Sequence, residues 1–118
     1  MNSVQFINIE DDEPDLILSF ALDDERLGIK SLILLRTPVY ESLLPENERG
    51  VNVSMEGDED LKNNLLEEIS IENGTITVSA LRSNYKLDTS RIENKEIDLM
   101  LKFIGKLNYD SSFKVSHA

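Results

Sequence analysis

The residues in this chain whose types and spacing could most readily carry chemistry are clusters of acidic side chains. They concentrate in three short segments, at residues 10–15 (EDDEPD), 23–25 (DDE) and 56–60 (EGDED). Closely spaced carboxylates can bind calcium, which takes several oxygen ligands. The third segment, however, lacks the loop pattern with acids at alternate positions and a terminal glutamate. We therefore expect no metal site, and we expect these acids to be solvated and ionised.

Side-chain catalysis also lacks its usual components. A nucleophile needs an oriented base beside it, and a general acid needs a carboxyl group whose surroundings raise its pKa. The single histidine, His117, stands one residue before the last one, where we expect nothing to orient it, and there is no cysteine. Gly57 and Gly74 are isolated, and neither a GxGxxG nor a GKS motif occurs. We predict that the protein is not an enzyme and has no cofactor.

The negative charge lies in the first half of the chain. Residues 1–60 hold 15 acidic and 4 basic side chains, whereas residues 61–118 hold 8 of each, so the net charge of −11 belongs to the first half. Such a field repels nucleic acid and anionic lipid and favours encounter with a basic protein. A role in keeping the protein soluble explains the excess of acidic residues equally well. The candidate partner-binding acids are Asp11, Asp12, Glu13, Asp23, Asp24, Glu25, Glu56, Asp58, Glu59 and Asp60.

A second group of candidate contacts lies in the connection at 37–50 (TPVYESLLPENERG). Val39, Tyr40, Leu43 and Leu44 would strengthen the binding hypothesis if they were exposed, because aromatic and large apolar anchors dominate many protein interfaces. Tyr40 is the residue of this group that we select as a candidate site residue. We expect at least half of the group to pack in the core.

The elements that must position these residues are organised around Asn73-Gly74. Runs of alternating apolar and polar residues flank this pair within 65–81, a pattern typical of a β-hairpin. Other predicted strands lie at 3–9, 16–22, 29–36 and 50–55, whereas 82–89 reads as irregular. Ser90 and Glu93 match a capping box at the start of a helix extending to Leu107.

The predicted fold is α+β: a single domain with a mostly antiparallel, twisted sheet of five or six strands. The helix at about 90–107 packs on one face, and residues 108–118 form a tail that is either poorly ordered or engaged only at Tyr109 and Phe113. The absence of cysteine, of a basic leader and of a long apolar run favours a soluble, cytoplasmic protein.

The order of these segments resembles small immunity proteins of bacterial polymorphic toxin and contact-dependent growth inhibition systems. The resemblance covers roughly residues 15–107 and rests on FALDDERLGIKSLILLRTP, ERGVNVSME, ENGTITVSAL and ENKEIDLMLKFIGKL. It implies an inhibitor that binds the C-terminal domain of a cognate toxin, often a nuclease with a basic surface, and blocks its active site or substrate path.

Two contact modes remain open under this hypothesis. The acidic turns could occlude a basic cleft, or an exposed strand edge at 4–9 could pair with a strand of the toxin. A small acidic adaptor or regulatory binding domain is the alternative function. The sequence leaves the oligomeric state, the contact residues and the toxin's activity undetermined.

Overall fold

The first half of the chain folds as an antiparallel meander in the computed structural model, which describes residues 1–12, 14–26, 28–58 and 63–117. Its four strands confirm the four predicted ones, with shifted ends. On the second strand, Leu16, Leu18 and Phe20 are buried while Ile17 and Ser19 between them are partly exposed, as expected for strand alternation. The strands are β1 (Asn2–Asp12), β2 (Asp15–Asp24), β3 (Gly28–Arg36) and β4 (Asn52–Met55).

The hairpin predicted around Asn73-Gly74 is confirmed. Strand β5 (Leu66–Glu72) pairs antiparallel with β6 (Thr75–Ala80), and Gly74 turns the chain with a φ of +73°. A bulge between Leu66 and Glu68 shifts the alternation of β5. Leu66, not Leu65, is therefore buried with Ile69 and Ile71.

The predicted number of strands is wrong, because the sheet has eight strands within the described residues, and the sheet is mixed rather than antiparallel, since two of its pairings are parallel. Residues predicted to be irregular contain β7 (Asn84–Asp88), and residues predicted to be a tail contain β8 (Lys114–His117). The strand β8 runs parallel to β5, and β7 runs parallel to the start of β1. Along the sheet the order is β4-β3-β2-β1-β7-β6-β5-β8. Strand β1 is interior in this order, but it pairs with β7 only at Asn2 and Ser3, so along the edge proposed at 4–9 it pairs with β2 alone. The terminal strands are β4 and β8.

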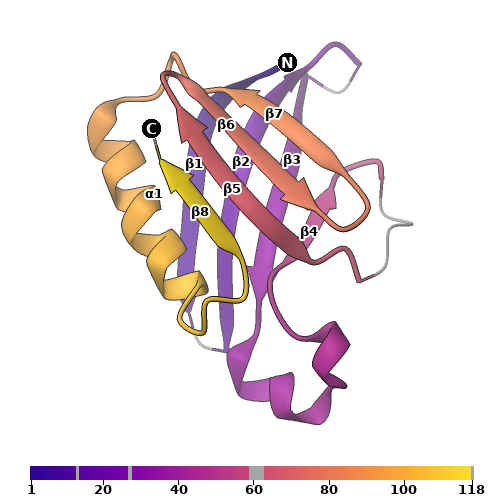
Figure 1. Cartoon of the computed structure of the whole chain (residues 1–118). Helices are drawn as coiled ribbons and strands as arrows, with labels where there is room; N and C mark the ends of the chain where they lie inside the picture. Colours follow the sequence, from indigo (N-terminus) through magenta and orange to yellow (C-terminus); the bar gives the residue numbers. More distant parts are fainter. Residues whose placement is uncertain (13, 27, 59–62, 118) are drawn as a thin grey trace.

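The sheet bends so that its two halves enclose the core. Figure 1 shows β5 to β8 in front of β1 to β4. The halves also meet at the start of β5, where the Leu66 amide donates to the Val51 carbonyl at 2.8 Å. Buried apolar side chains from both halves form one cluster, including Leu18, Leu34 and Val78. This common core makes the chain a single domain.

Helix α1 (Asn94–Leu107) lies along one side of the bent sheet (Figure 1). It buries Met100, Phe103, Ile104 and Leu107 in the common core. The predicted capping box is wrong: Glu93 is the N-cap, and no side chain caps the helix start. Among the described residues, no helix has the length and apolarity needed to cross a bilayer.

Candidate protein-interaction site

The most buried charged side chain is that of Arg36, at the end of β3. Its guanidinium is fully buried and donates two hydrogen bonds to Glu41, from Nε at 2.7 Å and from Nη2 at 2.9 Å. It donates two more to Asp110, from Nη1 at 2.9 Å and from Nη2 at 2.8 Å. This double fork uses the planar geometry of arginine, which lysine cannot reproduce. Arg36 therefore fixes two acidic side chains that are distant in sequence.

The same guanidinium connects three further groups around the end of α1. Nη1 donates to the Leu107 carbonyl at 2.8 Å and contacts the Ser112 hydroxyl at 3.2 Å, while the Tyr109 ring lies with its centroid 4.3 Å from Cζ. A cation at a helix C-terminus also interacts favourably with the helix dipole. Arg36 thus connects the sheet, the end of α1 and the segments that follow each of them.

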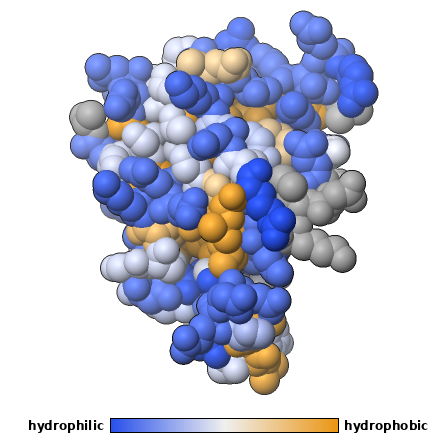
Figure 2. Space-filling model, turned by 45° about the vertical axis from the view of Figure 1, so that its right-hand side comes forward, coloured by the Kyte–Doolittle hydropathy of each residue, from blue (hydrophilic) through white to orange (hydrophobic). Residues whose placement is uncertain are grey.

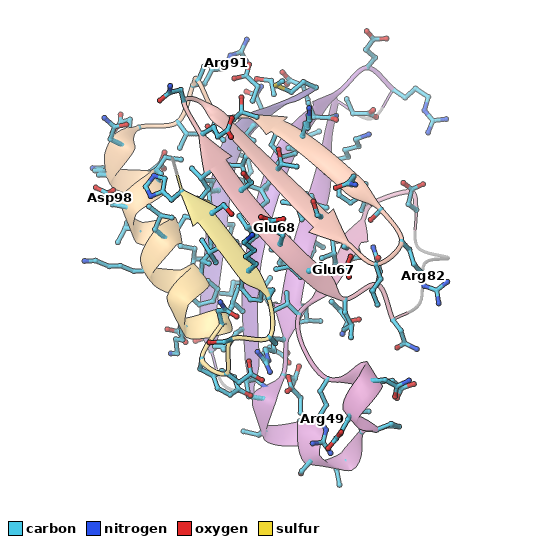
Figure 3. All side chains as sticks on the ribbon, viewed as in Figure 1. Arg49, Glu67, Glu68, Arg82, Arg91 and Asp98 are labelled. Carbon is cyan, nitrogen blue, oxygen red and sulfur yellow. The ribbon has the colours of Figure 1, made fainter. Side chains whose placement is uncertain are left out.

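Residues 37–49 form a projecting segment that extends beyond the sheet at the lower end of Figure 1. It contains two short 3-10 helices, η1 (Pro38–Leu43) and η2 (Glu46–Glu48). The buried side chain of Glu41 anchors η1 to Arg36. Arg49, seen within the segment in Figure 3, donates from Nε to the Leu44 carbonyl at 3.0 Å. The segment therefore has fixed contacts at both of its helices.

The first half of the projecting segment exposes large apolar side chains. Val39, Tyr40, Leu43 and Leu44 are between 40% and 79% exposed, so the expectation that half of them pack in the core is wrong. The reason is that η1 turns Glu41 inward to Arg36, which leaves its neighbours outward. Figure 2 shows apolar atoms at the tip of this end, beside hydrophilic atoms of the same end.

Beside the projecting segment lies an open pocket of about 340 Å³. Its walls come from the β1–β2 turn, η1 and the end of α1, and the Tyr109 ring that covers Arg36 forms one side. We call the pocket and the projecting segment together the projecting end. The pocket is lined by Pro14, Leu16, Pro38, Val39, Lys106 and Tyr109.

The structure separates the predicted acidic residues into two groups. Asp11 and Asp12 lie at the projecting end, and the Asp11 carboxylate holds Lys106 Nζ at 2.6 Å. The 23–25 turn and the start of the 56–60 segment lie together near the other end of β3, because Asp23 pairs with Ile29 while the Glu56 amide donates to the Ser31 carbonyl. Glu13, Glu59 and Asp60 lie outside the described residues.

Several of these acids have basic partners within the chain. Asp23 is 3.8 Å from Arg91 Nη1, and Asp24 is 3.8 Å from Lys30 Nζ. Tyr40 lies at the end opposite to these two pairs. The predicted site residues therefore do not form one patch, and Tyr40 is the one that lies on the exposed apolar surface. Within the described part of the chain, no group of three histidine or acidic side chains is placed to hold a metal ion.

The sequence predicts Tyr109 only as a contact of the tail, and it leaves the other residues that build the projecting end without a functional role. Arg36 is predicted only as part of a strand, and Asp110 only as part of the tail. A signal for Arg36 was present, since Leu32, Leu34 and Arg36 share one phase of β3 and the two leucines are typical of a buried face. A buried arginine requires acidic partners. Nothing in the sequence identified Asp110 as one of them.

The charges in this cluster stabilise one another. Burial disfavours the charged form of Arg36, but the hydrogen bonds that Arg36 donates to Glu41 and Asp110, together with the negative charges of these two residues, outweigh that effect and raise its pKa. The hydrogen bond from Arg36 lowers the pKa of the Asp110 carboxyl to about 2. Burial raises the pKa of the Tyr109 hydroxyl.

Acid should weaken the cluster through Asp110. A carboxyl group with a lowered pKa in the folded state contributes stability above its unfolded pKa, and this contribution is lost as the pH falls through the folded pKa. The relevant window runs from pH 3.8 down to about pH 2. We expect the urea midpoint of the wild type to fall more steeply across this window than that of Asp110→Asn. Parallel curves would contradict the assignment, and Asp98→Asn on the exposed face of α1 is the control (Figure 3).

Comparison with protein-family models, curated proteins and solved structures finds no match to this chain. Functional inference therefore depends on the chemistry of the chain's own residues.

Proposed function

We propose that this protein binds a partner protein through its projecting end and neutralises it, as a toxin-immunity protein does. The observation that carries the proposal is the exposure of Val39, Tyr40, Leu43 and Leu44 on a segment held in place by the buried Arg36–Glu41 pair. Exposed, clustered large apolar side chains are typical of interaction surfaces, and fixing them before binding reduces the entropy lost on association.

The charge of the chain supports a basic partner. A net charge of −11 accelerates encounter with a positively charged surface and disfavours nucleic acid. A toxin nuclease has such a surface, because its substrate is a polyanion. Under this proposal the protein acts in the cytoplasm of the toxin-producing cell, where it covers the active site or the substrate path of the toxin domain and performs no catalysis itself.

The proposal expects a toxin gene beside the gene of this protein, and coexpression of this protein with the product of that gene tests the proposal. We expect the toxin domain alone to arrest growth, and we expect coexpression of this protein to restore growth and to yield a complex that copurifies. If a partner binds without being toxic, the adaptor function is correct instead. Growth arrest that persists although both proteins are made would refute neutralisation.

The acidic turns should affect the rate of association more than the final affinity. In the variant Glu25→Lys/Glu56→Lys/Asp58→Lys, three exposed acids near the other end of β3 are reversed. We expect the association rate constant with the toxin domain to fall about tenfold at low salt and the difference to shrink as salt screens the charges. Stopped-flow measurements at two salt concentrations provide the test. Reversal of Glu67, Glu72 and Glu93, also exposed, is the control for net charge, and equal slowing by both variants would remove the specific role of the turns.

A further inference from the structure

The pocket at the projecting end has an apolar lining of unusual composition. Pro14, Leu16, Pro38 and Val39 contribute hydrocarbon surface, and the Tyr109 ring adds an aromatic wall. Prolines lose little entropy when a ligand packs on them, because the ring already fixes φ. Arg36 holds the Tyr109 ring from behind through a contact of 4.3 Å. The walls of the pocket are therefore fixed before any ligand arrives.

The charge around this pocket is negative. Asp12 and Asp15 stand on the two strands that lead into and out of the turn containing Pro14. Both are exposed, whereas Asp110 beside Tyr109 already binds Arg36 through both of its carboxylate oxygens. The one cation in the lining, Lys106, is held by both oxygens of Asp11 at 2.6 and 2.7 Å, so its charge is compensated. A ligand that enters the pocket thus meets an apolar floor and an acidic rim.

We infer that the pocket receives an apolar side chain from a segment of the partner protein in which lysine or arginine residues flank that side chain. The apolar side chain loses its contact with water against the prolines and Tyr109, and the flanking cations meet Asp12 and Asp15. This inference deepens the proposed function and rests on it, because it assigns the chemistry of the partner at the same site.

Other occupants fit the pocket less well. A second copy of this chain carries the same net charge of −11 and the same acidic rim, so charge repulsion opposes self-association here. Anionic lipid and nucleic acid meet the same repulsion. An uncharged apolar molecule would use the floor and leave the rim without a role. A segment that combines an apolar side chain with cations is complementary to both features.

Short synthetic peptides test the chemistry without the toxin. The probes are acetyl-Gly-Arg-Leu-Arg-Gly-amide, the same peptide with glutamate in place of both arginines, and the same peptide with serine in place of leucine. Each is titrated into the ¹⁵N-labelled full chain and followed by backbone amide shifts. With the Arg-Leu-Arg peptide we expect saturable shifts at Leu16, Val39, Lys106 and Tyr109, the lining residues that have an amide proton. We expect the other two peptides to bind at least about fivefold more weakly.

A pair of variants separates the pocket from general surface effects. We expect Val39→Glu to abolish the saturable shifts of the Arg-Leu-Arg peptide, because it places a charged group on the apolar floor. Val115→Glu alters an exposed apolar residue on β8 and should leave the shifts unchanged. Thermal unfolding of both variants verifies that they are folded.

The outcomes distinguish the inference from the proposed function. Absence of shifts at the lining residues, equal binding of the glutamate peptide, or equal loss in both variants overturns the pocket chemistry even if coexpression still neutralises the toxin. Saturable, arginine-dependent and leucine-dependent shifts together with failed neutralisation would overturn the toxin function and leave the pocket chemistry intact. Concentration-dependent dimerisation that involves the pocket amides would identify a second copy as the occupant and would also overturn the inference.

Discussion

Replacing Arg36 with alanine is expected to lower the free energy of unfolding by about 3 kcal/mol or more. The change leaves the buried Glu41 carboxylate without its cation and removes a hydrogen bond to the last carbonyl of α1. Removal of one partner from a buried ion pair is costly because the other charge stays desolvated. Urea unfolding followed by far-ultraviolet circular dichroism measures the loss.

Two further variants identify the cause of the loss. Arg36→Lys keeps a positive charge but cannot form both forks, so its stability should lie between those of Arg36→Ala and the wild type. Arg91→Ala removes a cation of an exposed pair, whose nearest oxygen on Asp23 is 3.8 Å away, and should change stability by no more than about 0.5 kcal/mol. If Arg36→Ala fails to fold, Arg36→Lys still provides the comparison. A lysine variant as stable as the wild type would contradict the role of the double fork.

Local patterns were sufficient to predict the strands whose neighbours in sequence are their neighbours in space. The alternation in β2 and the Asn73-Gly74 turn specify hairpin pairing within a few residues. Strand β8 is different, because it has one exposed apolar residue, Val115, and pairs in parallel with β5 only after α1 returns the chain. A strand defined by a distant partner leaves almost no periodic signal in its own sequence.

The candidate site was less predictable than the fold for a related reason. The composition of the segment containing Tyr40 indicated a connection with contacts, but whether its apolar residues faced inward depended on Glu41 and Arg36. That pair in turn depends on Asp110, which lies 74 positions from Arg36 in the sequence. The concentration of acidic residues alone predicted the three turns as a binding site. Folding, however, places these turns at opposite ends of β3 and gives some of their carboxylates basic partners. Exposure at the projecting end is therefore a property of the tertiary structure.

The double variant Tyr40→Ala/Leu43→Ala is expected to weaken binding of the toxin domain by about thirtyfold or more. Both side chains are more than half exposed in the free protein, so their removal takes little from the core. An interface that buries them loses two large anchors, and a loss of about 1 kcal/mol from each corresponds to about thirtyfold in affinity. Isothermal titration calorimetry gives the affinity, and thermal unfolding should show a stability within about 0.5 kcal/mol of the wild type.

Leu81→Ala is the matched control for this experiment. Leu81 is 56% exposed, almost the same as the 55% of Tyr40, but it follows β6 and lies away from the projecting segment. We expect this control to bind the toxin domain within about twofold of the wild type, since scattered exposed apolar residues are normal on a folded protein. Both variants remove exposed apolar side chains, but from different surfaces. A difference between their affinities for the toxin domain therefore locates the interface. Wild-type affinity in the Tyr40→Ala/Leu43→Ala protein would move the binding site away from the projecting end.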